Sequence, residues 1–230
     1  MNKTVWNRVD EKELEKLYGF TDEYRQFLSV SKTERTFVTN SIQLAEKAGF
    51  RPLEEYQELK AGDRVYVINR GKNLILFVIG KQPVKNGLNI LGAHIDSPRM
   101  DLKQRPLYEK DGLALFDTHY YGGIKKYQWV ASPMALVGVV VKKDGTVIDI
   151  NIGDREGDPV VGVSDLLIHL ASKQMAKTGS TVVEGESLDL MAGSIPSDEE
   201  KDPVKANILR ILKEKYDVEE DDFISAEIEA

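Results

Sequence analysis

Short apolar runs in the first hundred residues constrain the fold more than any other feature of this sequence. Residues 74–80 read LILFVIG and residues 88–94 read LNILGAH, and the strand-like stretch RVYVI (64–68) precedes both. In the two longer runs, the side chains that would point to either face of a strand are mostly apolar. This is the pattern of a strand covered on both faces. Such strands need covering layers, so the sequence predicts a helix-flanked sheet of the α/β class.

Helical patterns occur in three segments, the first of which belongs to this predicted sheet. Apolar residues recur at helical spacing in the segments 31–50, 164–177 and 202–216. We expect Ser31 and Glu34 to form a capping box, and Gly49 to end the first helix. Ser164 and Asp202 are the expected N-caps of the other two helices.

Strand patterns dominate the residues that follow Pro98. The runs ALVGVVV (135–141) and TVIDINI (146–152) are joined by KKDG and predict a hairpin. The stretch THYYGGIKKYQW (118–129) is aromatic, glycine-rich and basic, which indicates a contact loop or hairpin. The final residues, DFISAEIEA, alternate like a strand, and we expect this strand to lack a partner further along the chain.

Composition excludes several classes of protein. Lys and Arg number 31 against 38 Asp and Glu, a formal net charge of −7, which argues against nucleic-acid binding. The sequence has no cysteine, so disulfides and thiolate zinc sites are excluded. The N-terminus does not resemble a signal peptide, and no apolar run approaches the roughly 20 residues that span a bilayer. We therefore expect a cytoplasmic protein with no membrane contact.

The triplet His94-Ile95-Asp96 follows the second apolar run. Period-two geometry places the His94 and Asp96 side chains on the same side of a strand end. A zinc-binding histidine usually donates its second ring N–H to a carboxylate, so Asp96 is a candidate for that partner or for a direct ligand. Ser97 and Pro98 would end the strand, where open α/β sheets bind ligands. A structural or incidental His-x-Asp is the competing interpretation.

The block GAHIDSPRMDLKQRPLYEKDGLALFDTHYYGGIKKYQW resembles the aspartyl-aminopeptidase family of two-zinc metallopeptidases, and the likeness extends to FLSVSKTERTFVTNSIQLAEKAGF, SDLLIHLAS and FISAEIEA. The resemblance implies that His94 is a ligand of one zinc ion and that the catalytic role of Asp96 is to orient it and tune the metal. The family fold is an α/β/α sandwich interrupted by an inserted, largely β domain that forms dimers and large hollow oligomers.

The same resemblance implies a division of the chain. Residues 1–98 would form the N-terminal half of the catalytic domain, 99–222 the inserted dimerisation domain with its helices, and 223–230 the start of the returning catalytic strand. The family's other metal ligands and its glutamate general base follow the insertion and have no counterpart here. We therefore expect an incomplete sandwich, and at most one partial site of the two zinc ions.

Two functions remain open from the sequence. The first is a zinc aminopeptidase that removes N-terminal, possibly acidic, residues from peptide substrates and is inactive without its other half. The second is a non-catalytic fragment or assembly subunit that forms homo-oligomers through the inserted domain. His119 and His169 are candidates for substrate binding or for reaching a neighbouring subunit's site, although an ordinary surface pair with Asp165 also explains His169.

Overall fold

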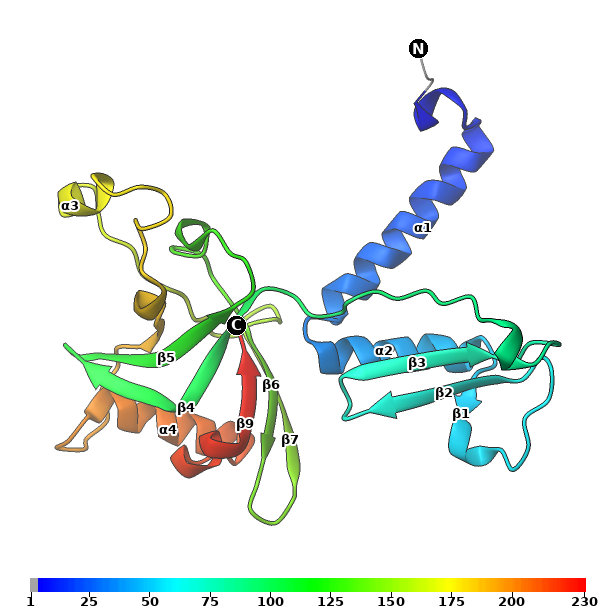
Figure 1. Cartoon of the computed structure of the whole chain (residues 1–230). Coiled ribbons are helices and arrows are strands. Elements are labelled where there is room, and N and C mark those ends of the chain that lie inside the picture. Colours follow the sequence, from blue (N-terminus) through cyan, green and yellow to red (C-terminus); the bar gives the residue numbers. More distant parts are fainter. Residues whose placement is uncertain (1–3) are drawn as a thin grey trace. The chain divides into compact units, whose positions relative to one another are not determined.

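The computed structural model describes residues 4–230, and its internal contacts divide the chain after Ser97. The N-terminal unit ends at Ser97 and the C-terminal unit comprises Pro98–Ala230 (Figure 1). None of the helices formed by the described residues combines the length and apolar character needed to cross a membrane. Short 3-10 helices lie at Val5–Asn7, Leu53–Glu55, Val84–Asn86, Lys126–Gln128, Gly185–Ser187 and Glu220–Ser225.

Two α-helices open the N-terminal unit: α1 (Glu11–Val30) and α2 (Glu34–Lys47). Asp10 caps α1 in a capping box with Glu13. The helix predicted at 31–50 is confirmed as α2, and Gly49 follows its C-cap with φ +86°. The predicted capping box was wrong, because Thr33 and Thr36 form it instead of Ser31 and Glu34.

The N-terminal sheet has the strand order β1-β2-β3. Its strands are β1 (Arg51–Pro52), β2 (Arg64–Asn69) and β3 (Asn73–Val78), with β2 and β3 forming an antiparallel hairpin. The Tyr66 hydroxyl donates to Glu46 Oε1 at 2.9 Å, which ties β2 to α2. Burial is the first cause that raises the Tyr66 pKa, and the Glu46 carboxylate is the second. Helix α2 therefore covers one face of this sheet.

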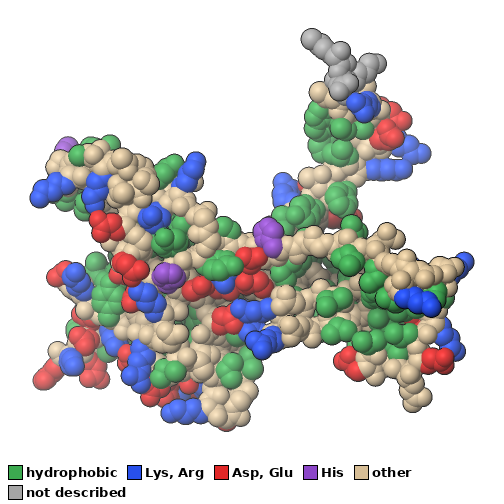
Figure 2. Space-filling view, viewed as in Figure 1, with side chains coloured by type: hydrophobic (Ala, Val, Ile, Leu, Met, Phe, Trp, Pro, Cys, Tyr) green, Lys and Arg blue, Asp and Glu red, His purple; other side chains and the backbone are tan. Residues whose placement is uncertain are grey.

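The apolar runs of this unit are less covered than their sequence predicts. The strand expected at 88–94 is absent, since these residues form neither helix nor strand, and Ile90 and Leu91 are 81% and 100% exposed. The expected strand at 74–80 is confirmed as β3, but Ile75 and Val78 are 61% and 57% exposed. Figure 2 shows hydrophobic side chains on the surface of this unit. Among the described residues, 88–94 has no strand partner, and β3 pairs with β2 on one edge only.

The C-terminal unit is built on one six-stranded antiparallel sheet with the strand order β7-β6-β9-β4-β5-β8. Its strands are β4 (Arg99–Lys110), β5 (Leu113–Tyr121), β6 (Leu136–Val141), β7 (Val147–Ile152), β8 (Leu190–Gly193) and β9 (Ala226–Glu229). The predicted hairpin is confirmed as β6 and β7. The apolar core of this unit includes Met100, Leu107, Val140 and Leu190, all at most 2% exposed.

Strand β9 lies between β6 and β4 in this sheet. Met100 and Ala230 exchange both backbone hydrogen bonds, at 3.0 and 2.9 Å, and Gly138 of β6 pairs with Ile228. The strand predicted at the end of the sequence is confirmed as β9. Its partners come from far earlier in the sequence, which local patterns do not reveal.

Helix α4 (Pro203–Tyr216) packs along β4, β5 and β8 and confirms the helix predicted at 202–216 (Figure 1). The predicted cap was wrong: Asp202 has φ +47° and makes no capping bond. Glu109 of β4 replaces it, because its Oε2 accepts from Val204 N at 2.8 Å and from Lys205 N at 3.0 Å. A carboxylate at a helix N-terminus also complements the helix dipole.

The prediction of a helix at 164–177 was wrong for most of that range. Only α3 (Ser172–Met175) is helical, and Val163 instead forms a β-bridge with Val130. Leu167 and Leu170 are 72% and 70% exposed, so this segment buries no apolar face that would stabilise a longer helix.

Substitution of Gly138 tests the β6–β9 contact. An alanine Cβ there would overlap the Glu227 backbone oxygen and lie 2.8 Å from Ile228 Cα, so Gly138→Ala must push the strands apart. We expect a loss of about 1–3 kcal/mol or more in the unfolding free energy of the C-terminal unit. Urea unfolding in a Trp6→Phe background, followed by Trp129 fluorescence, measures it.

Gly123→Ala is the matched control, because nothing lies within 4 Å of its Cβ position. Equal unfolding midpoints for the two variants would contradict the tight contact between β6 and β9.

Candidate functional site

His94 and Asp96 contact each other in the extended segment that follows β3. His94 Nδ1 lies 3.2 Å from Asp96 Oδ1 and 3.1 Å from the Asp96 backbone oxygen. The His94 side chain is 86% exposed and that of Asp96 is 36% exposed. The structure thus brings together the two residues that the sequence singled out, although no strand holds them.

The contact leaves one histidine nitrogen for a ligand. Because Nδ1 faces the Asp96 carboxylate, Nε2 is the ring atom open to a metal ion, as in a carboxylate–histidine–zinc arrangement. A catalytic zinc takes about three protein ligands. Among residues 4–230, no group of three or more His, Cys, Asp or Glu side chains stands close enough to hold a metal ion. The described residues therefore place one histidine next to one carboxylate, which fits part of a zinc site, and they show no group of three such side chains.

The other two histidines lie in the C-terminal unit. His119 of β5 stacks on Tyr120 at a centroid distance of 5.6 Å, and its Nδ1 is 3.9 Å from Glu186 Oε1. His169 is exposed in the turn before α3 rather than on the expected helix. The Asp165 carboxylate accepts from Gln174 Nε2 at 2.9 Å, so the structure shows no helical pair with His169.

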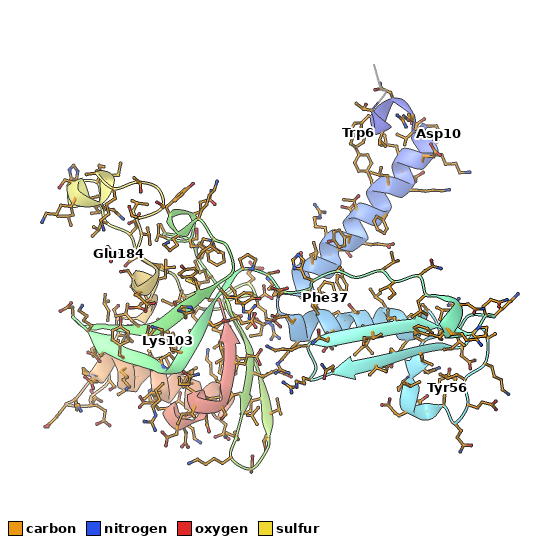
Figure 3. The ribbon with its side chains drawn as sticks, in the orientation of Figure 1. Trp6, Asp10, Phe37, Tyr56, Lys103 and Glu184 are labelled. Carbon is orange, nitrogen blue, oxygen red and sulfur yellow. The ribbon has the colours of Figure 1, made fainter. Side chains whose placement is uncertain are left out.

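A charged cluster on β4 and β5 was not found from the sequence. Lys103 Nζ lies 2.8 Å from Asp117 Oδ1 and 3.1 Å from Glu186 Oε2; Lys103 is labelled in Figure 3. The hydrogen bond to Asp117, and then that to Glu186, raises the pKa of Lys103. The ammonium group occupies the space between the two carboxylates, so this cluster stabilises the sheet surface. Its residues come from distant segments, which left no local signal.

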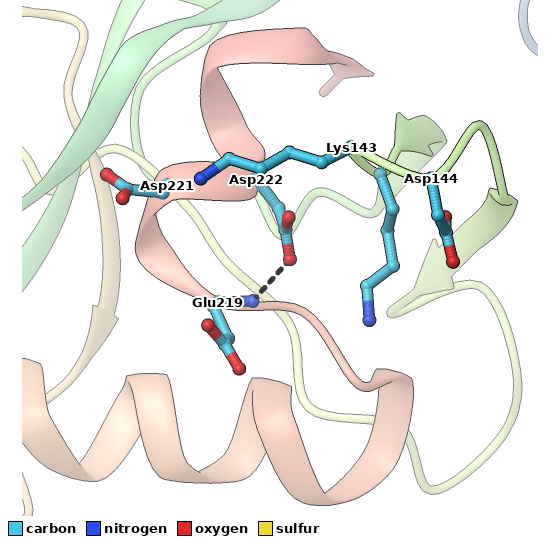
Figure 4. Close-up of a pocket in the computed structure, with 6 residues that line it drawn as sticks. Lys143, Asp144, Glu219, Asp221 and Asp222 are labelled. Atoms are coloured by element: carbon cyan, nitrogen blue, oxygen red, sulfur yellow. Dashed lines mark hydrogen bonds between the residues drawn. The ribbon is translucent and has the colours of Figure 1, made fainter.

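A surface hollow between the β6–β7 turn and the last 3-10 helix is also charged (Figure 4). It is lined by Lys142, Lys143, Asp144, Glu219, Asp221 and Asp222. The Glu219 backbone N–H donates to Asp222 Oδ2 at 2.9 Å, and Asp221 pairs with Arg105 at 3.2 Å. These carboxylates already have partners within the fold, so the hollow is a structural feature of the C-terminal unit.

Asp217, at the end of α4, gives a pH prediction. Hydrogen bonds from Lys142 and then Lys213 lower its pKa from 3.8 to about 2. A carboxyl group whose pKa is lower in the folded than in the unfolded chain stabilises the fold at pH values above its unfolded-state pKa. This contribution is lost as the pH falls from about 4 towards 2. We expect Asp217→Asn to lower the thermal midpoint slightly at neutral pH, since the side chain is 65% exposed, and not at pH 2.

Calorimetry from pH 2 to pH 7 measures this difference, with the exposed Asp198→Asn as the control. Asparagine tolerates the left-handed conformation of residue 217, where φ is +54°, so the substitution isolates the charge. A constant difference across the whole pH range would contradict the assigned role of the Asp217 carboxylate.

Comparison with known protein families matches residues 27–230 to the aminopeptidase I zinc metalloprotease family, M18. The chain belongs to this family. A protein named probable M18 family aminopeptidase 1 from Clostridium acetobutylicum is 54% identical over 233 residues, covering 99% of this chain and 50% of that protein. The protein of the same name from Thermotoga maritima is 47% identical, covering 99% of this chain and 49% of its own length.

Solved structures of the family share this fold. The crystal structure of the Thermotoga maritima M18 aminopeptidase matches with a TM-score of 0.92 and 46% identity, over 100% of this chain and 50% of that one. A dodecameric structure from Saccharomyces cerevisiae matches at 19% identity with a TM-score of 0.63, which shows likeness of fold alone. The M18 chain described here spans about half the length of the curated relatives it matches.

Zinc binding by the chain alone tests the assignment of His94. With one histidine ligand, we expect binding far weaker than that of a complete zinc site, and we expect His94→Ala to abolish it. Isothermal titration with zinc measures the affinity, and the exposed His169→Ala is the control. Tight, stoichiometric binding that survives His94→Ala would contradict the assignment.

Proposed function

We propose that this chain forms the first part of a zinc aminopeptidase that removes N-terminal residues from peptides. The single observation that carries the proposal is the His94–Asp96 contact at 3.2 Å within a chain that belongs to a zinc metalloprotease family. The finer preference for acidic N-terminal residues rests on the resemblance to aspartyl aminopeptidases. A cytoplasmic location, which the absence of cysteine favours, belongs to the same proposal.

His94 and Asp96 have distinct roles in this proposal. His94 Nε2 is the metal ligand, and the Asp96 carboxylate holds the ring in the tautomer and orientation that ligation needs. Zinc, when bound, supplies Lewis acidity towards the scissile carbonyl and a bound water. Further ligands for up to two zinc ions, and a glutamate base, would come from a segment equivalent to the half of its relatives that this chain does not span.

We also propose a division of roles along the chain. Residues 1–98 and 223–230 would belong to the catalytic domain, and the insertion 99–222 would form oligomers. The boundary after Ser97 supports the start of the insertion, while the same C-terminal unit also contains residues 223–230. The pairing of Met100 with Ala230 also supports an insertion, because it brings the two ends of the C-terminal unit side by side, as an inserted domain requires. His119 and His169 are our candidates for contact with substrate or with a neighbouring subunit.

A second function, an assembly subunit that forms homo-oligomers, is favoured by one exposed apolar segment. Leu166, Leu167, Ile168 and Leu170 are 54%, 72%, 66% and 70% exposed. Contiguous apolar surface of this kind marks interaction sites. The dodecamer with a similar fold is consistent with this role. Sedimentation of the chain alone measures its assembly. Oligomers of the chain, together with no peptidase activity in any sample of the assay below, would favour the second function.

An aminopeptidase assay tests the first function. The chain is incubated with zinc and chromogenic aminoacyl substrates, acidic and neutral, alone and after co-expression with the second half of the Clostridium acetobutylicum relative. We expect turnover only in the co-expressed sample, loss of turnover with His94→Ala, and a 10–100-fold loss of metal affinity or activity with Asp96→Asn.

Glu200→Gln, an exposed loop residue, is the control for expression and folding. Turnover by the chain alone that is lost in His94→Ala would contradict the proposed dependence on a second half. Turnover in the co-expressed sample that survives His94→Ala would contradict the assigned ligand.

A further inference from the structure

Asn86 combines a reactive sequence with an exposed position. It is the only asparagine in the sequence that a glycine follows. Glycine has no Cβ, so its backbone nitrogen approaches the preceding asparagine side chain without steric hindrance. Residues 81–90 are all exposed, and a Cβ built on Gly87 would meet no atom within 4 Å. Water and the neighbouring backbone therefore both have access to the Asn86 side-chain amide.

The structure holds this pair of residues only weakly. Asn86 ends the 3-10 helix Val84–Asn86, a single turn in which the Gly87 N–H donates to Val84 O at 2.9 Å. The Asn86 side-chain nitrogen donates to Gln82 Oε1 at 3.5 Å, which is the long limit for a hydrogen bond. The turn buries none of its side chains, so it opens at a small cost in free energy.

The fold itself requires the glycine at this position. Gly87 leaves the turn with φ +118° and ψ 167°, a backbone conformation that is essentially restricted to glycine. A residue with a side chain would therefore strain the turn even though the space around Gly87 is open. The local backbone thus keeps the least hindered of all residues next to Asn86.

Asn40 shows how the same unit protects an asparagine. It precedes Ser41, another small residue, but both lie within α2. The Asn40 side-chain nitrogen donates to Val30 O at 3.1 Å and to Ser31 Oγ at 3.0 Å. Backbone N–H groups in the middle of a helix are bonded to the carbonyl four residues earlier. A reaction at Asn40 therefore requires that part of α2 unfold, whereas one at Asn86 requires only that an exposed turn open.

We propose that Asn86–Gly87 is a site of spontaneous deamidation, which converts Asn86 into a mixture of aspartate and isoaspartate. The Gly87 backbone nitrogen loses its proton and attacks Asn86 Cγ to form a succinimide ring. The bond between Cγ and the side-chain nitrogen breaks, and ammonia leaves with that proton. The inference is independent of the proposed function.

Water completes the reaction by opening the succinimide ring. Hydrolysis of the bond between the Gly87 nitrogen and Asn86 Cγ gives aspartate. Hydrolysis of the bond between the same nitrogen and the main-chain carbonyl carbon of residue 86 gives isoaspartate. One asparagine and one water thus give one acid and one ammonia, so the reaction needs no oxidant, reductant or cofactor.

Deamidation changes both the charge and the backbone of this segment. Residues 80–95 contain Lys81 and Lys85 but no Asp or Glu, so the reaction introduces the first carboxylate there. Isoaspartate also adds a methylene group to the main chain, before the exposed run that ends at His94. The isoaspartyl carboxylate is the group that isoaspartyl methyltransferases methylate, so an enzyme of this class is the partner that fits the product.

Peptide mapping of the aged full chain tests the inference. The chain is incubated at neutral and at mildly alkaline pH, with and without urea, then digested at acidic pH and analysed by mass spectrometry. In the folded chain we expect Asn86 to lose its amide at least tenfold faster than Asn40, and faster as the pH rises, because the attacking nitrogen must lose its proton.

Urea separates the effect of the fold from that of the sequence. We expect urea to change the rate at Asn86 by less than about tenfold, and to raise the rate at Asn40 by more than that, since only Asn40 lies within a long helix. A rate at Asn86 in the folded chain that is no greater than the rate at Asn40 would contradict the proposal.

A matched pair of variants makes the test specific. Asn86→Gln keeps a side-chain amide, but its longer side chain would have to close a larger and less favourable ring. Asn89→Gln is the control, because Asn89 is exposed in the same segment and is followed by Ile90.

An isoaspartyl methyltransferase with a radiolabelled methyl donor measures isoaspartate in the aged samples. We expect Asn86→Gln to remove most of the methyl incorporation and Asn89→Gln to leave it unchanged. Incorporation that is equal in the original chain and in Asn86→Gln would overturn the inference, since isoaspartate would then form elsewhere, such as at Asp111–Gly112.

Discussion

The backbone pairing of Met100 with Ala230 is the constraint on which the C-terminal unit depends. It places β9 between β4 and β6 and so joins two hairpins, β4–β5 and β6–β7, into one sheet. Ile228 of β9 is 5% exposed and belongs to the same core as Met100 and Val140. Without that central strand, the two hairpins would have open edges, and the core side chains that pack against Ile228 would be exposed.

Buried charge reinforces the same junction. Glu229 of β9 is 6% exposed, and its carboxylate lies 3.4 Å from Arg99 Nε, which also contacts Asp101 at 2.7 Å. The Arg99 guanidinium stacks 4.2 Å from the centre of the Tyr121 ring. A buried carboxylate needs such partners, because an unpaired one would be costly to bury. The beginning and the end of this unit are thus held by hydrogen bonds, charge and packing together.

The N-terminal unit shows the opposite balance. Its sheet is covered by α2 on one face, while β3 and the residues before His94 remain exposed. Apolar side chains left in solvent in this way mark a candidate interaction surface. His94, the metal ligand that we propose, is the last residue of that exposed segment.

Local pattern was sufficient for α2, α4, β2, β3 and the β6–β7 hairpin, because each depends on periodicity and turn residues within one short segment. The sequence by itself also singled out His94 and Asp96, since two residues at period two need only a locally extended chain to meet. The tertiary structure alone decided that Glu109 caps α4, that β9 has partners on both sides, and that 88–94 is not a strand. Those outcomes depend on segments distant in sequence, and no local pattern records which neighbour a strand or a cap will find.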